Sequence, residues 1–539
     1  MRETRVLPAA VAALALLAAA SVDAAKKYIF TSWELGDVSP EEVLLMADRF
    51  DATACDGVAL YPGTSLRGCD SRRPRYAMTD PGIRYDEVAH LEPTLRAIVR
   101  HPSLRESMLS VCLAPTNRLA WTDAEAWRRA GENLATYARL ARNAGLRGLI
   151  ADGEDYWRQR QFFYRPDVDA GDYRALCRAA RERARDLLGP VFREYPGITV
   201  LSFQLLSIRA EYHGGDDLVG RMAEMRDLLP AFVNGVLDVM PPEAKIVDGN
   251  EDGGYHAEAE RRDFYRRATE ERAVVLPLVA KENRAKYRAQ VSAGFGLYMD
   301  SYTSSTNSGW YKGPARGKRI NRFEDNLRQA TLCTDEYVWF WGEKGFWIDW
   351  PADLKERSGN PGWRSSGGGS WRAKYFGGVR DWGVIRPWRE TMDGDFDLMA
   401  RGVKEPARCV REQLARQEAD GTFANLADGP RAHVSLKADG PGSARLTGLE
   451  VDGWYGVTVR GRGEIVRGYV YFQRHGAWRW DLGSFRLSFG APGADGWREG
   501  VTLVRIPDGA TDIYCAFDGP KGEKDAKVAF RDLKVFRIR

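Results

Sequence analysis

Eight short apolar segments alternate with longer helical ones between residues 28 and 341 of this 539-residue chain. Each apolar segment is rich in Val, Ile, Leu, Tyr or Phe, as expected of a buried strand. The expected strands are 28–32, 57–61, 109–113, 148–151, 199–203, 245–247, 294–298 and 337–341. Regular alternation of strands and helices favours a parallel sheet covered by helices, and eight repeats predict a (β/α)8 TIM barrel of the α/β class.

Helix signals separate these strands. Ser39 followed by Pro40 is typical of a capped helix start. Longer helical segments are expected over 123–144 and 217–239, and a run over 394–418 is expected to close the barrel.

From residue 422 the sequence pattern changes to short alternating strands separated by Gly, Asp and Pro. The expected strands are 432–436, 455–460, 468–472, 485–489, 501–506, 512–517 and 528–538. This pattern predicts an antiparallel β-sandwich. We therefore expect a barrel domain over 25–421 and a sandwich over 422–539.

The first 24 residues have the pattern of a secretory signal peptide. Arg2 and Arg5 precede an apolar run over 7–20, and Val22-Asp-Ala24 supplies small residues for cleavage. The run is short for a membrane span. The sequence thus predicts a secreted or periplasmic protein without a membrane anchor.

Composition argues against several classes of partner. The net charge is +4, and Lys and Arg stand beside Asp and Glu along the helices, so nucleic acid is not expected as a partner. Six His form no HxH or HExxH pattern, and no Gly-rich phosphate loop follows a strand. We expect neither a metal nor another cofactor, and the sequence leaves the oligomeric state open.

Two expected strands run directly into clusters of acids. Asp152 and Glu154 follow strand 148–151, and Asp248, Asn250 and Glu251 follow strand 245–247. The carboxyl ends of barrel strands form the face where active sites are built. A pair of carboxyl groups there is suited to cleavage of a glycosidic bond, which needs a proton donor on one side and a carboxylate or activated water on the other.

Further candidates follow other strands. Glu343, after the eighth strand, joins Asp152, Glu154 and Glu251 as a candidate catalytic residue. The candidate substrate-binding residues are Trp33, Glu34, Tyr61, Tyr156, Asp248, Asn250, Tyr255, Asp300 and Trp341. Gly253-Gly254 is expected to let the backbone approach a ligand closely. The chain has 17 Trp, and those at strand ends, Trp121, Trp310 and Trp347 among them, are candidate platforms for sugar rings, with packing as the alternative.

The motifs in combination suggest a family. Asp152-x-Glu154-x-Tyr156, Leu228-Leu-Pro-Ala-Phe-Val-Asn-Gly, Ile246-Val-Asp-Gly-Asn-Glu251 and Tyr337-Val-Trp-x-x-x-Glu343-Lys344 together resemble secreted TIM-barrel glycoside hydrolases of polysaccharide-degrading bacteria. The resemblance covers about residues 28–420 and implies hydrolysis at the barrel mouth, with Glu154, Glu251 and Glu343 among the acids. It departs from the expected pattern at Asp252-Gly-Gly, where a Ser-Tyr pair is expected. The segments Ile506-Pro-Asp-Gly-Ala and Phe530-Arg-Asp-Leu-Lys-Val-Phe are similar to jelly-roll carbohydrate-binding-like modules.

The sequence therefore predicts an exported glycoside hydrolase acting on a polysaccharide or oligosaccharide. Glu154 or Asp152 would pair with Glu251, and the sequence does not assign the role of each acid. Two alternatives stay open: a non-catalytic glycan-binding barrel protein, and a polysaccharide lyase.

Overall fold

The computed structural model describes residues 26–32, 35, 38–62, 77–79, 81–155, 157–213, 217–257, 261–343, 345–348, 386–421, 442–465, 467–519 and 528–538. The chain divides into two compact units. The first comprises 1–313 with 322–394, and the second comprises 314–321 with 395–539. The predicted domain boundaries at 24/25 and 421/422 stay predictions.

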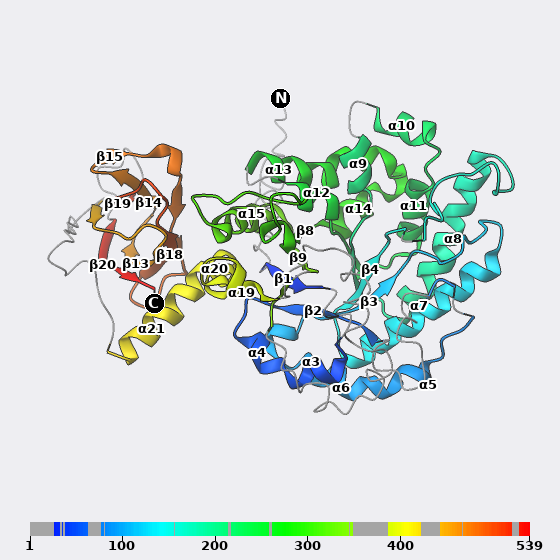
Figure 1. The fold of residues 1–539 in the computed structure, drawn as a ribbon, viewed down its shortest axis with the longest axis horizontal. Helices are drawn as coiled ribbons and strands as arrows, with labels where there is room; N and C mark the ends of the chain where they lie inside the picture. Colours follow the sequence, from blue (N-terminus) through cyan, green and yellow to red (C-terminus); the bar gives the residue numbers. More distant parts are fainter. Residues whose placement is uncertain are drawn as a thin grey trace, which may run out of the picture. The chain divides into compact units, whose positions relative to one another are not determined.

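The first unit is built on a nine-stranded parallel sheet in the order β7-β6-β5-β4-β3-β2-β1-β9-β8 (Figure 1). Its strands are β1 (Lys27–Phe30), β2 (Gly57–Leu60), β3 (Met108–Cys112), β4 (Gly148–Asp152), β5 (Thr199–Ser202), β6 (Lys245–Asp248), β7 (Val291–Ala293), β8 (Phe295–Tyr298) and β9 (Tyr337–Trp341).

The sheet closes on itself at Gly294. This residue joins β7, which pairs with β6, to β8, which pairs with β9. Because β7 and β8 occupy one position, the nine strands fill eight positions, and the predicted α/β barrel is confirmed.

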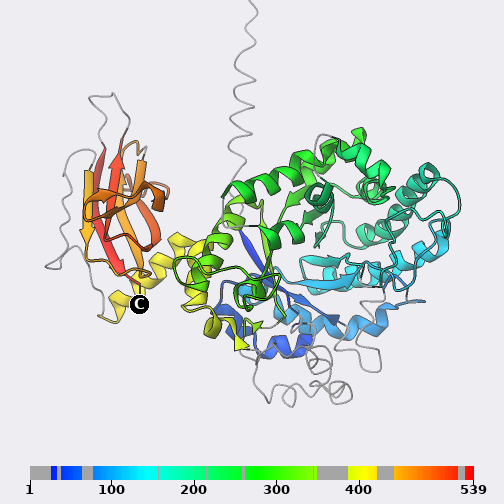
Figure 2. The same ribbon diagram turned by 45° about the horizontal axis from the view of Figure 1, so that its top comes forward.

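Helices cover the outside of the barrel strands (Figures 1 and 2). The α-helices described in this unit are α3 (Pro40–Leu45), α4 (Ala47–Asp51), α5 (Tyr85–Val88), α6 (Glu92–Ile98), α7 (Ala124–Ala144), α8 (Tyr173–Glu194), α9 (Ser207–His213), α10 (Leu218–Glu224), α11 (Leu229–Val239), α12 (Glu251–His256), α13 (Arg261–Thr269), α14 (Arg284–Gln290), α15 (Arg319–Cys333) and α19 (Trp388–Thr391). Ser39 caps α3 through a capping box, as predicted. Within the described part of the chain, no helix has the length and apolar character needed to cross a membrane.

The helix expected over 217–239 is two helices, α10 and α11. Between them Arg226 adopts a left-handed conformation with φ 55°. The backbone N–H of Leu228 then donates to the carbonyl of Phe162, and that of Leu229 to the Asp227 carboxylate. These bonds to a distant loop and to a side chain replace the helical ones, so tertiary contacts interrupt a continuous helical pattern.

The second unit holds two antiparallel sheets, one ordered β12-β19-β14-β15 with β16 beside β14, the other β17-β18-β13-β20. Their strands are β12 (Gly442–Thr447), β13 (Trp454–Arg462), β14 (Arg467–Arg474), β15 (Ala477–Trp478), β16 (Ser484–Arg486), β17 (Ser488–Phe489), β18 (Trp497–Arg505), β19 (Asp512–Asp518) and β20 (Ala529–Arg537). Apolar side chains from both sheets, including Val457 and Phe472, form one core, so the predicted β-sandwich is confirmed.

Several details of this unit differ from expectation. Strands β12 and β15 were not predicted, and the expected strand 485–489 forms β16 and β17, which belong to different sheets. The expected strand 432–436 lies outside the described residues. The helical run expected to close the barrel forms α20 (Phe396–Lys404) and α21 (Pro406–Ala419), and α21 contacts the sandwich. Gln417 Nε2 of α21 donates to the carbonyl of Arg537 in β20 at 2.9 Å.

Candidate active site

The acid clusters meet where β4, β5, β6 and β9 end, above the core of the barrel. Trp339 of β9 fills the centre of this core, fully buried and stacked on Phe203 with ring centroids 4.2 Å apart. A Cβ at Gly249 or Gly296 would lie 2.8 or 2.6 Å from the Trp339 ring, so glycine makes room for it. The packed indole forms a rigid floor beneath the residues that follow the strands.

Glu251 is the first residue of α12, and it is held in place by its backbone. Asn250 before it adopts a left-handed conformation with φ 41°, and the Glu251 N–H donates to the carbonyl of Phe203 at 3.1 Å. Gln204 Nε2, just after β5, donates to Glu251 Oε2 at 3.0 Å. Only 7% of Glu251 is exposed.

The surroundings of Glu251 favour its protonated form. Burial, followed by the nearby carboxyls of Glu154 and Asp152, raises the pKa of Glu251 well above its ordinary value. The hydrogen bond from Gln204 acts in the opposite direction and is outweighed. A carboxyl group that keeps its proton near neutral pH is equipped to act as a general acid.

Asp152 and Glu154 face Glu251 from the end of β4. Asp152 is the last residue of the strand, and its Oδ1 accepts from the backbone N–H of Glu154 at 3.0 Å. Both are half-buried. Asp155, by contrast, is exposed and accepts from the backbone N–H groups of Gln159 and Arg160, so it holds the turn that follows.

Tyr255 stands among these acids. Its ring is buried beside Tyr298, and its hydroxyl has no hydrogen-bond partner among the described residues. Burial, with the nearby carboxyls of Glu251 and Glu154, raises the pKa of the Tyr255 hydroxyl, which therefore remains a proton donor. A buried hydroxyl without a partner is costly to leave unpaired, so it is well suited to bind a ligand oxygen.

The two glycines before Tyr255 have a packing role. A Cβ at Gly254 would lie 2.0 Å from the carbonyl oxygen of Gly296 in β8, and one at Gly253 would lie 1.9 Å from the Asn250 side chain. At these two glycines the backbone therefore lies close to other protein groups, whereas a close approach to a ligand was expected. This packing brings α12, and with it Glu251 and Tyr255, against the barrel wall.

Glu343 is held at the end of β9 by three groups. Tyr298 OH donates to its Oε2 at 3.1 Å, and Trp341 Nε1 donates to its Oε1 at 3.2 Å. Its backbone N–H donates to Asp300 Oδ2 at 2.6 Å. Asp300 is completely buried and holds the backbone of Glu343. The structure therefore does not support the predicted contact between Asp300 and a substrate.

The other two candidates after β6 are also supports. Asp248 is completely buried and accepts from the backbone N–H and the hydroxyl of Ser207 at 2.9 and 2.5 Å. Asn250 donates from Nδ2 to Glu271 Oε1 at 2.5 Å, inside the protein. Both side chains are buried and already hydrogen-bonded to protein groups, so their placement does not support the predicted role of substrate-binding residues.

The tryptophans at strand ends divide into two groups. Trp121 and Trp347 are buried, stacked on Trp127 and Phe30, and serve packing. Trp310 is partly exposed and lies edge-on to Tyr255 and Tyr298, with ring centroids 6.0 and 5.4 Å away.

The remaining candidates are placed as follows. Tyr61 and Trp341 are half-buried against the barrel core. Trp33, Glu34 and Tyr156 lie outside the described residues.

Gln204 and Tyr298 were not predicted as site residues. Gln204 directly follows the expected strand 199–203, so the rule that selected the acids, a polar side chain at a strand's carboxyl end, could have found it. Tyr298 ends a strand itself, and only its contact with Glu343 distinguishes it from a core residue.

A cavity of about 200 Å³ opens beside the acids. It shares Gly153 and Gln204 with the site and is otherwise lined mainly by apolar side chains from several elements, such as Val200 of β5, Phe192 of α8 and Phe232 of α11. Asp155, Arg160 and Arg209 also line it, whereas none of the candidate catalytic acids does.

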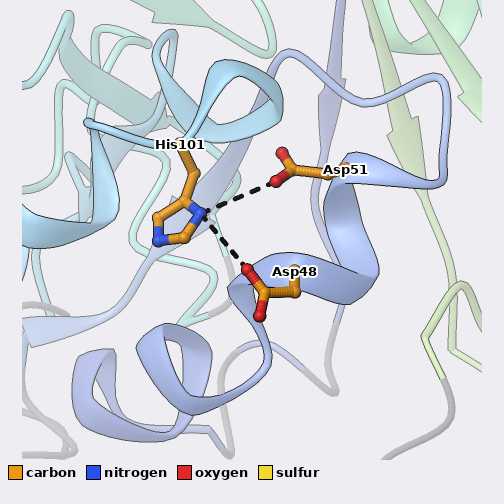
Figure 3. A group of neighbouring side chains, drawn as sticks. All are labelled: Asp48, Asp51 and His101. Atoms are coloured by element: carbon orange, nitrogen blue, oxygen red, sulfur yellow. Dashed lines mark ion pairs between the residues drawn. The ribbon is translucent and has the colours of Figure 1, made fainter.

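One group of possible metal ligands lies elsewhere. His101 Nδ1 lies 3.7 Å from Asp51 and 3.9 Å from Asp48, and Figure 3 marks both contacts with dashed lines. Asp51 also accepts from the hydroxyl of Ser103 at 2.5 Å. These residues precede β2 and β3, at the opposite end of the barrel from the acids, and both Asp residues are exposed. The group is explained as a surface ion pair.

No protein-family model and no curated protein matches the chain. Similar solved structures include a GH27 β-L-arabinopyranosidase from Geobacillus stearothermophilus, 6% identical over 93% of this chain and 98% of that one, with a TM-score of 0.30. A GH31 α-xylosidase from Xanthomonas citri is 10% identical over 91% of this chain and 46% of that one, with a TM-score of 0.31. A 3-keto-D-glucoside 4-epimerase from E. coli is 13% identical over 63% of this chain and 100% of that one, with a TM-score of 0.30. The neighbours thus include glycoside hydrolases and a different enzyme, and at these scores they carry no argument about activity.

Proposed function

We propose that the chain is an exported glycoside hydrolase that cleaves an O-glycosidic bond of a polysaccharide or oligosaccharide at the barrel mouth. The observation that carries this proposal is the burial of the Glu251 carboxyl beside two further acids, Glu154 and Asp152, an environment that raises the pKa of Glu251. Glycoside cleavage requires one protonated and one ionised carboxyl group. The raised pKa of Glu251 favours the protonated form in one of these three acids.

In the proposed reaction Glu251 is the general acid. It gives its proton to the glycosidic oxygen as the bond to the anomeric carbon breaks, so that the sugar leaves as a neutral alcohol. Gln204 positions the Glu251 carboxyl by donating to Oε2, which leaves Oε1 to carry the transferred proton.

Glu154 is the partner carboxylate on the other side of the anomeric carbon. Its backbone is fixed by Asp152, so its side chain is presented from a constrained turn. The negative charge of Glu154 stabilises the oxocarbenium-like centre that develops as the bond breaks, and before the reaction it favours the protonated form of Glu251. Water then adds its oxygen to the anomeric carbon, and one of the two carboxylates, Glu154 or the deprotonated Glu251, takes the proton that this water loses, which completes the hydrolysis.

The surrounding residues are proposed to hold the sugar. The unpaired Tyr255 hydroxyl and the Glu343 carboxylate supply a donor and an acceptor for sugar hydroxyls. Trp341 and Trp310 offer aromatic surface for a ring.

Export is proposed from the leader over 1–24. It fits a polymeric substrate, because polysaccharides are degraded outside the cell. Expression of the full chain and sequencing of the N-terminus of the exported protein tests this step. An N-terminus at Ala25 supports it, and retention of residues 1–24 contradicts it.

The decisive experiment measures the release of reducing ends from aryl glycosides and a panel of polysaccharides. It compares the parent protein, residues 25–539, with its Glu251→Gln and Glu154→Gln variants. We expect each substitution to lower kcat/KM by about 10²- to 10⁴-fold, with an unchanged Tm. Asp155→Asn is the matched control, since Asp155 lies on the same loop but is exposed, and its activity should stay within about twofold of the parent.

Three outcomes would overturn the proposal. Full activity in both Gln variants would remove the acids from the mechanism. Glycan binding without release of reducing ends would indicate a non-catalytic binding protein. An unsaturated product absorbing in the ultraviolet would indicate a lyase.

A further inference from the structure

One sheet of the sandwich carries a cluster of aromatic side chains on its outer side. In β14, Val470 and Phe472 point into the core, so Tyr469 and Tyr471 point away from it. The outward residues form a cluster that we call the aromatic face: Tyr469, Tyr471, Trp478, Trp480 and Tyr514.

The aromatic face is ordered by contacts among its own rings. Trp478 and Trp480 are stacked, with centroids 4.8 Å apart and planes 10° from parallel. Tyr471 meets both indoles edge-on at 6.0 and 5.6 Å, and Tyr514 meets Trp478 edge-on at 5.0 Å. Despite this packing, 42% of Trp478 and 65% of Trp480 are exposed.

Such a cluster on a water-facing surface indicates a binding site. Large aromatic side chains are normally buried, and contiguous exposed ones mark a surface that a ligand covers. Here the rings hold one another in place before a ligand arrives, so binding requires little further ordering of side chains.

The charges around the aromatic face are mostly paired. Arg445, directly opposite Tyr514 in the sheet, donates to Asp512 at 2.9 Å. Arg479 makes two hydrogen bonds to Asp481, at 2.8 and 2.6 Å. Arg486, opposite Tyr469, adds a single exposed cation.

This charge pattern favours an uncharged ligand. A nucleic acid would need several cations free to meet phosphates, whereas two of these arginines already hold carboxylates. A neutral sugar polymer matches the pattern, because the C–H faces of its rings stack on indoles and its hydroxyls bond to fixed Arg–Asp pairs without removing a net charge from water.

A hollow of about 540 Å³ adjoins the aromatic face through Arg445 and Asp512. Thr447, His475 and Thr511 also line it, together with apolar residues such as Leu449, Val451 and Ala510. Its volume lies in the range of small-ligand sites, roughly 300–1,000 Å³. Flat aromatic rings beside a hollow with both apolar and hydrogen-bonding groups suit a ligand with both C–H faces and hydroxyls.

We propose that the aromatic face, with the adjoining hollow, binds a neutral polysaccharide chain by stacking sugar rings on Trp480 and Trp478. This is a second carbohydrate site, separate from the acids of the barrel. It goes beyond the proposed hydrolase activity and does not depend on it, since a surface that binds a polymer needs no catalytic acid.

The test measures depletion of the full mature chain, residues 25–539, from solution by microcrystalline cellulose, insoluble xylan, chitin and starch granules. The double variant Trp478→Ala/Trp480→Ala should lose at least tenfold in affinity for the polymer that the parent binds. Trp497→Ala is the matched control, because Trp497 lies on the other sheet beside Arg531, and it should bind as the parent does.

Two further measurements keep the result interpretable. Trp480→Phe retains a ring at the most exposed position, so its affinity for the polymer should lie between those of the parent and the double variant. This variant tests the proposal even where the double variant folds poorly. Hydrolysis of a soluble aryl glycoside measures the activity of the barrel alone and should have the same rate in all these variants. Loss of polymer binding and absence of hydrolysis are therefore separate results, and each tests only one of the two proposals.

The proposal is overturned if the parent binds none of the four polymers, or if the double variant binds as tightly as the parent. It is also overturned if the parent binds a single-stranded oligothymidylate through Trp478 and Trp480 in place of a polysaccharide. Self-association in sedimentation velocity that disappears in the double variant would likewise assign the face to protein contact.

Discussion

The barrel mouth and the aromatic face of the sandwich use the same kinds of residue under opposite conditions. In the barrel, Trp339 is fully buried and the nearby Glu251 holds a raised pKa because water is excluded. On the sandwich, Trp480 is 65% exposed, and Asp481 beside it has a lowered pKa because Arg479 donates to it. Aromatic rings beside carboxylates therefore do not define one function.

The difference lies in what burial does to a charge. Where rings exclude water, an acid without a cation keeps its proton and can transfer it. Where rings are open to water and each acid has a cation, the acid stays ionised and only the ring surface is available to a ligand. We therefore expect chemistry at the barrel mouth and binding alone at the aromatic face.

The largest expected contrast is in stability. Trp339→Ala should lower the free energy of unfolding by about 3–5 kcal/mol, because it leaves a cavity in the barrel core and an unpaired Gly249 carbonyl. Trp480→Ala should lower it by about 1 kcal/mol or less, because it removes mainly the stack on Trp478. Urea denaturation of each variant measures both values. Equal losses would show that the buried and the exposed tryptophan contribute alike to stability.

A second, smaller contrast lies within the loop after β6. Asp248→Ala should destabilise the barrel by about 2–4 kcal/mol, because the N–H and hydroxyl of buried Ser207 lose their acceptor. Glu251→Gln, three residues later, should leave stability unchanged or raise it. Thermal unfolding of both variants tests this contrast, and a Tm loss for Glu251→Gln equal to that for Asp248→Ala would assign Glu251 to structure.

The sign of the Glu251 effect follows from its raised pKa. The stability that its protonated form contributes is fully present below its ordinary pKa of 4.5 and is lost as pH rises through the folded value. Removing this acid should therefore flatten the decline of stability with rising pH.

The smallest expected effect is a displacement of the pH profile. Asp152→Asn keeps the oxygen that accepts from the Glu154 N–H but removes a negative charge near Glu251. The pKa of Glu251 should fall, so the alkaline limb of kcat/KM should move to lower pH. Asp155→Asn, on the exposed part of the loop, should not move it. A limb that stays in place in Asp152→Asn would show that Glu251 is not the proton donor.

Sequence patterns were sufficient for the barrel strands because each strand is a local signal. The apolar segments 57–61 and 337–341 fall on β2 and β9, and the rule of strand ends selected Glu154 and Glu251 as candidates. It also selected Asp248 as a substrate-binding candidate, because the sequence does not show that Asp248 is buried against Ser207. The left-handed turn at Asn250 sets the position of Glu251, and the hydrogen bond from Ser207 holds Asp248 in the interior.

The parallel barrel, the antiparallel sandwich and the strand ends that carry acids can be predicted from the sequence, because apolar alternation, caps and turns involve neighbouring positions. Three features could be learned only from the folded protein: Asp300 supports Glu343, Trp121 lies in the core, and Trp480 lies on the surface. Burial, and the charge state that burial imposes on a carboxyl group, depend on residues that are distant in the chain and meet only when it folds.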